Sequence, residues 1–221
     1  MASQNPAAQP RQQERAKITR HKLLAAAGAV FEEYGYAAAT LERVYERAGV
    51  TKGALYFHFR SKEILAQAVL DAQVGSGGVP DQECRVQQIV DVVFAFAERL
   101  LTDPLGKGSA RLSTDQDAPG VDHAAPYRDW ADLLIDLLEK AQRNQELLPA
   151  VDLRGMAELL VGSFGGIQVQ SRALNGREDL RERVSFLLKR LLPSFVHPGL
   201  LMRIDMEPDR ALRMTTMTRA D

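Results

Sequence analysis

The amino-acid sequence predicts an all-α protein, in which a small N-terminal set of three helices is followed by a larger helical body. Apolar residues recur at intervals of three and four along most segments, as they do on one face of a helix. No segment alternates apolar and polar residues for long, as a half-buried strand would. Residues that typically begin and end helices, such as threonine, serine, glycine and proline, separate the segments.

The first predicted helix covers about Gln13 to Tyr34 and ends at Gly35. One stripe of it is apolar: Ile18, Leu23, Leu24, Ala27, Val30 and Phe31. Residues 1–10 are small or polar and include two prolines, and we expect a disordered tail there. The stretch 11–22 carries five Lys and Arg residues and one acid. These cations indicate either a solvated helix start or, if a nucleic-acid-binding motif follows, a surface for phosphate.

Two short helices joined by a tight turn are predicted between Thr40 and Glu63. Thr40 is a suitable N-cap for the first of them, and Gly49 follows it where a left-handed residue is needed. Thr51 is placed to cap the second, Lys52–Phe59. A helix of this length is not stable alone in water, so it must pack against a neighbour.

The second short helix is predicted to have a packing side and an exposed side. On the packing side we expect Ala54, Leu55, Phe57 and Phe59. On the exposed side we expect Lys52, Gly53, Tyr56 and His58. A cation, a bare backbone and two amphipathic rings on a short, rigidly packed helix suit the major groove of DNA.

A fourth helix, capped by Ser61, is predicted from Lys62 to about Val74. The glycine-rich stretch 75–78 follows it, so we expect 61–78 to be a connecting helix and linker. The body, 79–195, is predicted to form helices at about 83–102, 109–114, 127–144, 152–174 and 177–192. The sequence DPLGKG at 103–108 is expected to break the helical pattern. Residues 196–221 are less regular and are predicted to be a C-terminal tail, frayed or disordered in its last part.

The sequence AGVTKGALYFHFRSKE, with VFEEYGY at Val30–Tyr36, resembles the signature of TetR-family transcriptional regulators from about Arg15 to Gln73. GVTKGALYFHF, together with Trp130, more narrowly resembles the γ-butyrolactone autoregulator receptors of that family. The resemblance implies a helix-turn-helix DNA-binding domain at 11–60 and a ligand-binding and dimerisation domain at 79–195. It also implies a homodimer that binds a palindromic double-stranded DNA operator.

The resemblance further implies roles for individual residues. Those expected to approach bases are Thr51, Lys52 and Gly53. Those expected to hold phosphates are Thr40, Tyr56, His58 and Lys62, joined by Lys17 and Arg20 of the first helix. We expect the helices at 152–174 and 177–192 to form a four-helix bundle with those of the second subunit.

Trp130, the only tryptophan, is the centre of the predicted ligand site. A single tryptophan on an amphipathic helix is most often a core residue, but the resemblance implies that Trp130 lines a ligand cavity. Ser163 and Gln73 lie within apolar stripes and are expected to supply hydrogen bonds. Their alternatives are a serine bonded to its own helix backbone and a solvated helix end. The apolar lining is expected to be Val93, Phe94, Phe96, Leu134, Leu137, Phe164 and Ile167.

These inferences predict a repressor released from DNA by a small amphipathic molecule of γ-butyrolactone or butenolide type, controlling secondary-metabolite or antibiotic biosynthesis genes. The alternative within the family is a regulator that senses an antibiotic or another hydrophobic drug. An enzyme is disfavoured because the chain has no P-loop, dinucleotide fingerprint or nucleophile elbow. A protein-binding helical adaptor would lack sequence-selective, salt-steep DNA binding. We expect no cofactor and no metal, since the His residues are scattered without metal spacing.

Charge and composition agree with a DNA-binding protein. Residues 1–62 hold 10 Lys and Arg against 5 Asp and Glu, a net charge of +5, and the remainder holds 18 against 24, a net charge of −6. A basic N-terminal part on an acidic body is expected of a protein that presents one face to phosphates. The single Cys84, the lack of an apolar run of about 20 residues and the lack of an apolar signal region predict a cytoplasmic protein without membrane contact.

Overall fold

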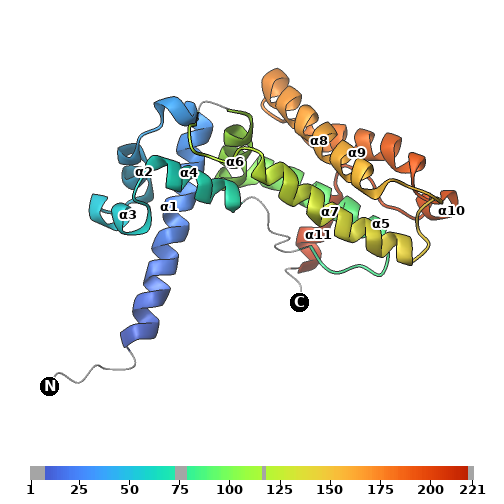
Figure 1. The fold of residues 1–221 in the computed structure, drawn as a ribbon, viewed down its shortest axis with the longest axis horizontal. Helices are drawn as coiled ribbons and strands as arrows, with labels where there is room; N and C mark the ends of the chain where they lie inside the picture. The colour runs from blue at the N-terminus through green and yellow to red at the C-terminus, as the bar shows by residue number, and fades with distance from the viewer. Residues whose placement is uncertain (1–7, 73–78, 116–117, 219–221) are drawn as a thin grey trace. The chain divides into compact units, whose positions relative to one another are not determined.

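The computed structural model of the chain describes residues 8–72, 79–115 and 118–218. Within these ranges every regular element is helical, and the only strand-like pairing is a single antiparallel bridge between Leu147 and Val196. The predicted all-α fold is thereby confirmed. The chain divides into two compact units, Met1–Gln73 with Asp103–His123 and Val74–Thr102 with Ala124–Asp221 (Figure 1).

The first unit consists of α1 (Ala8–Ala38), α2 (Leu41–Ala48), α3 (Lys52–His58), α4 (Lys62–Asp71) and α6 (Pro104–Thr114). α1 contacts each of the other four helices, and its N-terminal half projects beyond them (Figure 1). The side chains fully buried in this unit include Leu23, Phe31, Leu55, Leu65 and Leu112. α1 therefore forms the axis around which the short helices are packed.

The predicted break after 102 is confirmed at Asp103, but the next helix begins at Pro104 and not at about 109, so most of 103–108 is helical. The Asp103 carboxylate accepts a hydrogen bond from the Leu105 N–H at 2.9 Å, and Pro104 occupies the first turn, where its missing N–H costs nothing. The helix that follows, α6, lies against α1 so closely that a Cβ added to Gly108 would be 2.2 Å from the Gly28 carbonyl oxygen. Consequently α6 is part of the first compact unit, whereas we had assigned it to the continuous body 79–195.

The second unit contains α5 (Arg85–Thr102), α7 (Ala125–Arg143), α8 (Leu153–Asn175), α9 (Leu180–Leu191), η1 (Leu192–Ser194), α10 (Pro198–Leu201) and α11 (Arg210–Thr218). The ends of α5, α7, α8 and α9 differ from the predicted ones by at most three residues. α5 packs against α7, α9 and α11, and α8 packs against both α7 and α9. The start of the N-terminal helix is less well predicted, since α1 begins at Ala8, inside the expected tail. The predicted interruption at Gly35 is confirmed, because this residue has non-helical φ/ψ (φ 72°) and a kink there precedes the last residues to Ala38.

The first turn of α5 is capped by a residue far away in the sequence. The Glu146 carboxylate, which follows α7, accepts hydrogen bonds from the N–H groups of Arg85 (3.0 Å) and Val86 (2.8 Å). The Asn144 side-chain amide donates to the same carboxylate at 2.9 Å. This arrangement satisfies backbone donors that a helix start leaves free, and it joins the end of α7 to the start of α5.

The prediction that the last part of the C-terminal tail, 211–221, is frayed or disordered is wrong for its described residues, since α11 (Arg210–Thr218) is helical. Arg210, at the start of α11, donates two hydrogen bonds through Nε and Nη2 to the Asp91 carboxylate of α5, at 2.8 and 3.0 Å. Asp91 is completely buried. The Gln87 side chain bonds both the carbonyl and the N–H of Asp205, at 3.2 and 2.8 Å. The segment is ordered by this polar contact with α5, which local sequence patterns do not indicate.

Candidate DNA-binding and ligand-binding sites

The turn between α2 and α3 is held by the caps that the sequence predicts. The Thr40 hydroxyl accepts a hydrogen bond from the Arg43 N–H at 3.3 Å, and the Thr51 hydroxyl accepts one from the Ala54 N–H at 3.2 Å. Gly49 adopts the left-handed conformation (φ 65°) between them. Leu55 is completely buried, so it anchors α3 to the rest of the unit.

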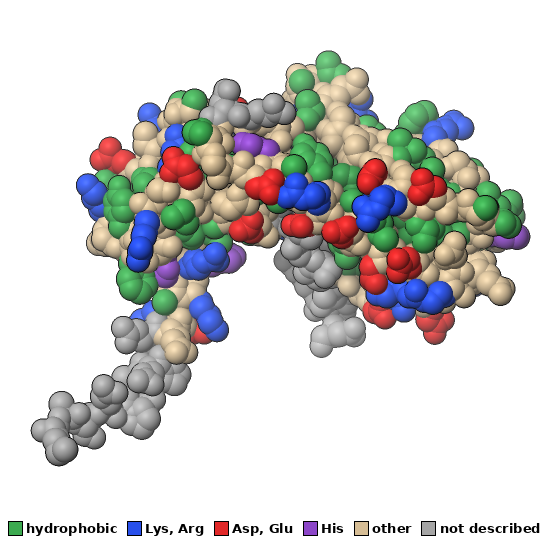
Figure 2. Space-filling model, viewed as in Figure 1, with side chains coloured by type: hydrophobic (Ala, Val, Ile, Leu, Met, Phe, Trp, Pro, Cys, Tyr) green, Lys and Arg blue, Asp and Glu red, His purple; other side chains and the backbone are tan. Residues whose placement is uncertain are grey.

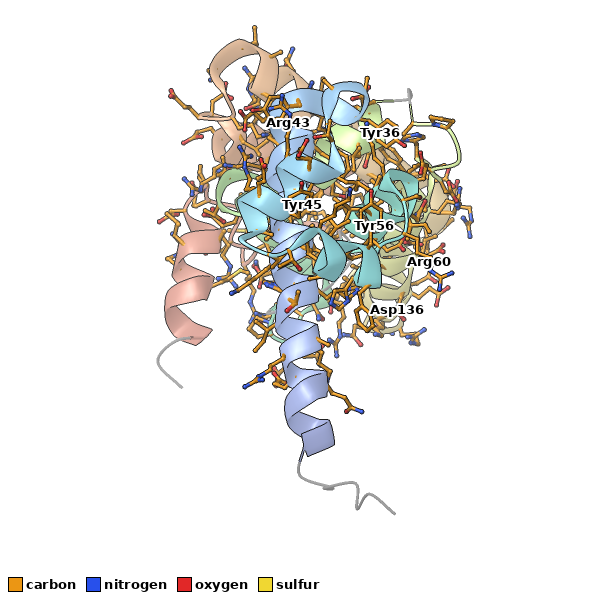
Figure 3. The ribbon with its side chains drawn as sticks, turned by 90° about the vertical axis from the view of Figure 1, so that its left-hand side faces the viewer. Tyr36, Arg43, Tyr45, Tyr56, Arg60 and Asp136 are labelled. Atoms are coloured by element: carbon orange, nitrogen blue, oxygen red, sulfur yellow. The ribbon has the colours of Figure 1, made fainter. Side chains whose placement is uncertain are left out.

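The outer side of α3 presents the side chains predicted to face DNA. Thr51, Lys52 and Gly53 are exposed, and Tyr56 is 43% exposed. The Lys52 Nζ lies 5.9 Å from the centre of the Tyr56 ring, and Figure 3 shows Tyr56 on the same side of the unit as Tyr45 of α2. A Cβ built on Gly53 would have only the Thr51 hydroxyl within 4 Å, at 4.0 Å, so a large group can approach this backbone closely.

Phe57 lies on the exposed side of α3, contrary to the prediction that it packs inside. Its side chain is 79% exposed and stands edge-on to the His58 ring, with 5.1 Å between the ring centres. The reason is the helical period: Phe57 comes two residues after the buried Leu55 and is therefore rotated by about 200° from it. An exposed phenylalanine next to Tyr56 adds apolar surface to the face of α3 that was predicted to present a cation, a bare backbone and two amphipathic rings.

The N-terminal part of α1 contributes cations to this surface. Lys17 and Arg20 are exposed, and the Arg20 guanidinium lies 5.5 Å from the centre of the Phe59 ring at the end of α3. Burial, and secondly the charge of Arg20, lower the pKa of the half-buried His58. His58 is therefore a neutral hydrogen-bonding group at pH 7. Figure 2 shows Lys, Arg and His side chains close together on this part of the unit.

Lys62 has a structural contact in addition to its predicted role. Its Nζ donates a hydrogen bond to the Ala37 carbonyl at 3.2 Å and lies 4.3 Å from the centre of the Tyr36 ring. Partial burial lowers the pKa of this ammonium. The Tyr36 hydroxyl donates to the neighbouring Glu63 at 3.1 Å. Lys62 and Tyr36 thus join the start of α4 to the end of α1.

In the second unit, the predicted ligand-binding residues of α5, α7 and α8 form an aromatic cluster. The Phe96 ring is 4.6 Å from the Trp130 ring and 5.0 Å from the Phe164 ring, centre to centre. The other predicted lining residues that are buried are Val93, Phe94, Leu134 and Leu137, while Ser163 and Ile167 are half-buried. The Trp130 N–H is buried without a hydrogen-bond partner among the described residues. Gln73 lies outside the described residues.

The sequence interpretation missed two features of this cluster. Tyr127, one turn before Trp130 on α7, lies over Gly165: a Cβ on that glycine would be 3.8 Å from the Tyr127 ring carbon Cε1. The inward stripe of α8 consists of Ala157, Leu160, Phe164, Gln168 and Ser171, so a glutamine follows Phe164 by one turn. The i, i+3 spacing of Tyr127 and Trp130 could have identified the first. Gln168 could have been found as a polar residue on an apolar stripe.

Comparison with protein-family models finds two matches. Residues 23–69 match the bacterial regulatory proteins of the tetR family, and residues 84–197 match the tetracyclin repressor-like C-terminal domain. The chain belongs to the TetR family. The first match covers most of the helix-turn-helix unit described above, and the second covers α5 to η1.

This TetR-family chain is 39% identical to the A-factor receptor protein of Streptomyces griseus over 195 residues, which are 88% of this chain and 70% of the relative. Its fold is similar to that of full-length TylP, a TetR regulator from Streptomyces fradiae, with a TM-score of 0.84, 42% identity and coverage of 95% and 93% of the two chains. It is also similar to CprB of Streptomyces coelicolor in complex with its operator sequence, with a TM-score of 0.66, 29% identity and coverage of 91% and 96%.

These findings establish the class of protein. TetR-family members are DNA-binding transcriptional regulators that act as dimers, and the relatives are regulators rather than enzymes. None of the helices in the described part of the chain is both long and apolar enough to span a bilayer. Among the same residues, no three His, Cys, Asp or Glu side chains form a group able to hold a metal ion.

Proposed function

We propose that this TetR-family protein is a repressor that binds a palindromic operator as a dimer and is released by a small amphipathic molecule of the γ-butyrolactone or butenolide type. The single observation that carries the ligand part is the buried Trp130 N–H, which has no partner in an otherwise apolar cluster. A buried donor without an acceptor is unfavourable, and a ligand carbonyl would satisfy it. The similarity to the A-factor receptor supports control of secondary-metabolite or antibiotic biosynthesis genes.

The exposed face of α3 supports the proposed DNA contacts. Thr51, Lys52 and Gly53 lie at its start, where a recognition helix presents residues to base edges. Tyr56 and His58 would reach phosphates from its outer side, and Lys17 and Arg20 would extend these contacts along α1. The Thr40 hydroxyl already accepts a hydrogen bond from the Arg43 N–H, and the Lys62 ammonium already donates one to the Ala37 carbonyl. These two groups would contact phosphate through their remaining hydrogen-bonding positions.

The outer sides of α8 and α9 support dimerisation through these helices. Large apolar side chains are exposed there: Leu159 (46%), Val169 (45%), Leu174 (67%) and Phe186 (63%). Gly162 and Gly166 of α8 are exposed, and an added Cβ at either would meet no atom of the chain within 4 Å. Glycines on an outward face allow the backbone of a second helix to approach closely. A partner's α8 and α9 would cover this apolar surface in a four-helix bundle.

Release requires that the ligand bind one state of the dimer better than the other. We propose that ligand binding next to Trp130 favours a conformation in which α4 is shifted. Such a shift would change the separation of the two α3 helices, which must match the spacing of the operator half-sites. Ligand and operator would then weaken each other's binding by the same factor.

The proposal is tested with an operator selected from a random pool of DNA by the purified protein. A gel shift on this DNA is titrated with a γ-butyrolactone that carries an acyl chain, and Trp130 fluorescence reports ligand binding directly, since the chain has one tryptophan. We expect the lactone to change the fluorescence and to release the DNA. Release by a hydrophobic drug such as triclosan, with no effect of the lactone, would favour the drug-sensing alternative. If no palindromic sequence is selected, the proposal fails.

A further inference from the structure

Tyr45 and Glu42 form a hydrogen-bonded pair on α2, outside the helix α3 that is expected to face DNA. The Tyr45 hydroxyl donates a hydrogen bond to Glu42 Oε1 at 3.1 Å. The Tyr45 ring is half-buried and packs against the core of the first unit, whereas Glu42 is exposed. The packing of the ring therefore fixes the hydroxyl at the surface, and Glu42 accepts its hydrogen there.

The pair lies near the exposed side of α3. Figure 3 shows Tyr45 and Tyr56 on the same side of the first unit. Burial, then the hydrogen bond with Glu42, and then the charges of neighbouring groups, among them Tyr56, raise the pKa of Tyr45. An electrostatic effect of Tyr56 requires that the two phenol groups lie near each other. The raised pKa also means that the Tyr45 hydroxyl keeps its hydrogen at neutral pH and can donate it.

A phosphate that approaches this surface meets Tyr45 as a donor and Glu42 as a competing acceptor. The first helix of a helix-turn-helix crosses the DNA backbone, and tyrosine hydroxyls donate to phosphate oxygens. A hydroxyl has a single hydrogen, so Tyr45 can donate to the carboxylate or to a phosphate but not fully to both. The charge of Glu42 also repels a phosphate at close range.

We propose that Tyr45 is a further phosphate-binding residue of the DNA-binding surface and that Glu42 holds its hydroxyl hydrogen in the free protein. When DNA binds, the hydroxyl turns from the Glu42 carboxylate to a phosphate oxygen. Glu42 thereby weakens the binding of operator and of unrelated DNA alike, since phosphates carry no sequence information. This inference rests on the proposed function and deepens it, because it names a residue pair that sets the strength of DNA binding.

The test is a double-mutant cycle on the full chain, with gel-shift affinities at one salt concentration for an operator selected by the wild-type protein. Relative to wild type, we expect Glu42→Gln to bind about fivefold more tightly and Tyr45→Phe about twofold more weakly. The double variant should bind about as tightly as wild type. Glu42→Gln then gains about fivefold when the hydroxyl is present but only about twofold, from the charge alone, when it is absent.

Glu46→Gln is the matched control. Glu46 is exposed on the same helix, one turn after Glu42, and affects the Tyr45 hydroxyl through its charge. Its replacement removes the same charge, so any gain in affinity should be equal in the wild-type and Tyr45→Phe backgrounds. Tyr45→Phe keeps the packing of the ring, and thermal unfolding checks that each variant is folded. A second selection from random DNA with Glu42→Gln should yield the same operator sequence as wild type.

Three results would overturn the inference. If Glu42→Gln gains equally with and without the Tyr45 hydroxyl, Glu42 acts through its charge alone and does not hold the hydroxyl. If Glu42→Gln selects a different operator sequence, the carboxylate contacts a base. Both results leave the proposed function intact. If wild type selects no palindromic operator, the proposed function fails, and the inference fails with it.

Discussion

The indole of Trp130 has two separable properties, its ring and its N–H. Replacing it by phenylalanine keeps an aromatic ring beside Phe96 and removes the donor. We expect Trp130→Phe and Trp130→Ala to need roughly tenfold or more additional lactone to release DNA, because a buried hydrogen bond to the ligand is lost. The operator affinity without ligand should stay unchanged in a gel shift. An equal loss of operator affinity would indicate that Trp130 is only a core residue.

Lys52 and Tyr56 are exposed, and the Lys52 ammonium lies near the Tyr56 ring. We expect Lys52→Ala and Tyr56→Ala to weaken operator binding by about 1–3 kcal/mol each, as loss of a base or phosphate contact does. Lactone-induced changes in Trp130 fluorescence should persist in both variants. Unchanged operator affinity in both would exclude α3 as the DNA-reading helix.

His58 makes stability depend on pH in a defined direction. Its folded-state pKa is lowered from the ordinary 6.5 by burial and by Arg20, so the unfolded chain binds the proton more readily. The stability that neutral His58 contributes is fully present above about pH 6.5 and is lost as the pH falls through the lowered pKa. Urea unfolding between about pH 7.5 and 5.5 should therefore show a steeper loss of stability in wild type than in His58→Gln. Equal slopes in wild type and His58→Gln would contradict the assignment.

At the scale of single residues, the sequence predicted the exposed Lys52 and the buried Trp130 because helical spacing separates the two sides of a helix. The same rule places Phe57 on the exposed side of α3. The prediction placed Phe57 on the packing side because it assumed that aromatic residues pack inward. Gln168 was missed because the predicted lining continued from Phe164 to the apolar Ile167, whereas the buried stripe of α8 continues from Phe164 to Gln168.

At the scale of helices, the contact between α1 and α6 depends on two glycines. A methyl group at Gly108 would meet the Gly28 backbone, with its carbonyl oxygen only 2.2 Å away, so Gly108→Ala must push the helices apart. We expect a loss of about 1–3 kcal/mol in unfolding free energy, measured by urea denaturation. Gly162→Ala on the open side of α8 is the control, where better helix propensity should offset any loss within the subunit. Equal stability of Gly108→Ala and wild type would show that the helices can separate freely.

Helix identity followed from the sequence wherever caps and apolar periodicity agreed, as for α2, α3 and α4. The start of α6 was misjudged because DPLGKG contains a proline and two glycines, which ordinarily indicate a loop. Here Asp103 and Pro104 act as a helix-starting pair, and Gly108 serves a close contact between helices. Local composition cannot distinguish these two uses of the same residue types.

At the scale of the whole chain, the ion pair between Asp91 and Arg210 is one of the polar contacts that join the C-terminal segment to α5. Asp91 is fully buried, and its main cationic partner is Arg210, which is 18% exposed. Arg210→Ala would leave a buried carboxylate without that partner, and we expect it to destabilise the protein by roughly 3 kcal/mol. Arg213→Ala, at a more exposed ion pair, should cost less than about 1 kcal/mol. Similar small losses in both variants would mean that α11 is dispensable.

The hydrogen bond between Asp91 and Arg210 joins residues 119 positions apart in the sequence, so no local sequence pattern predicts it.

The backbone contact between Gly28 and Gly108 also bears on how this protein can be divided for experiments. A fragment that stops at the glycine-rich linker would contain every residue expected to touch DNA and yet lack the helix that covers α1 and α4. Without α6, the apolar core residues that pack around Leu112 would be exposed to water, and the truncated domain would aggregate. An autonomous DNA-binding module therefore has to be assembled from two separate pieces of the gene, with 103–123 fused back to the first 73 codons.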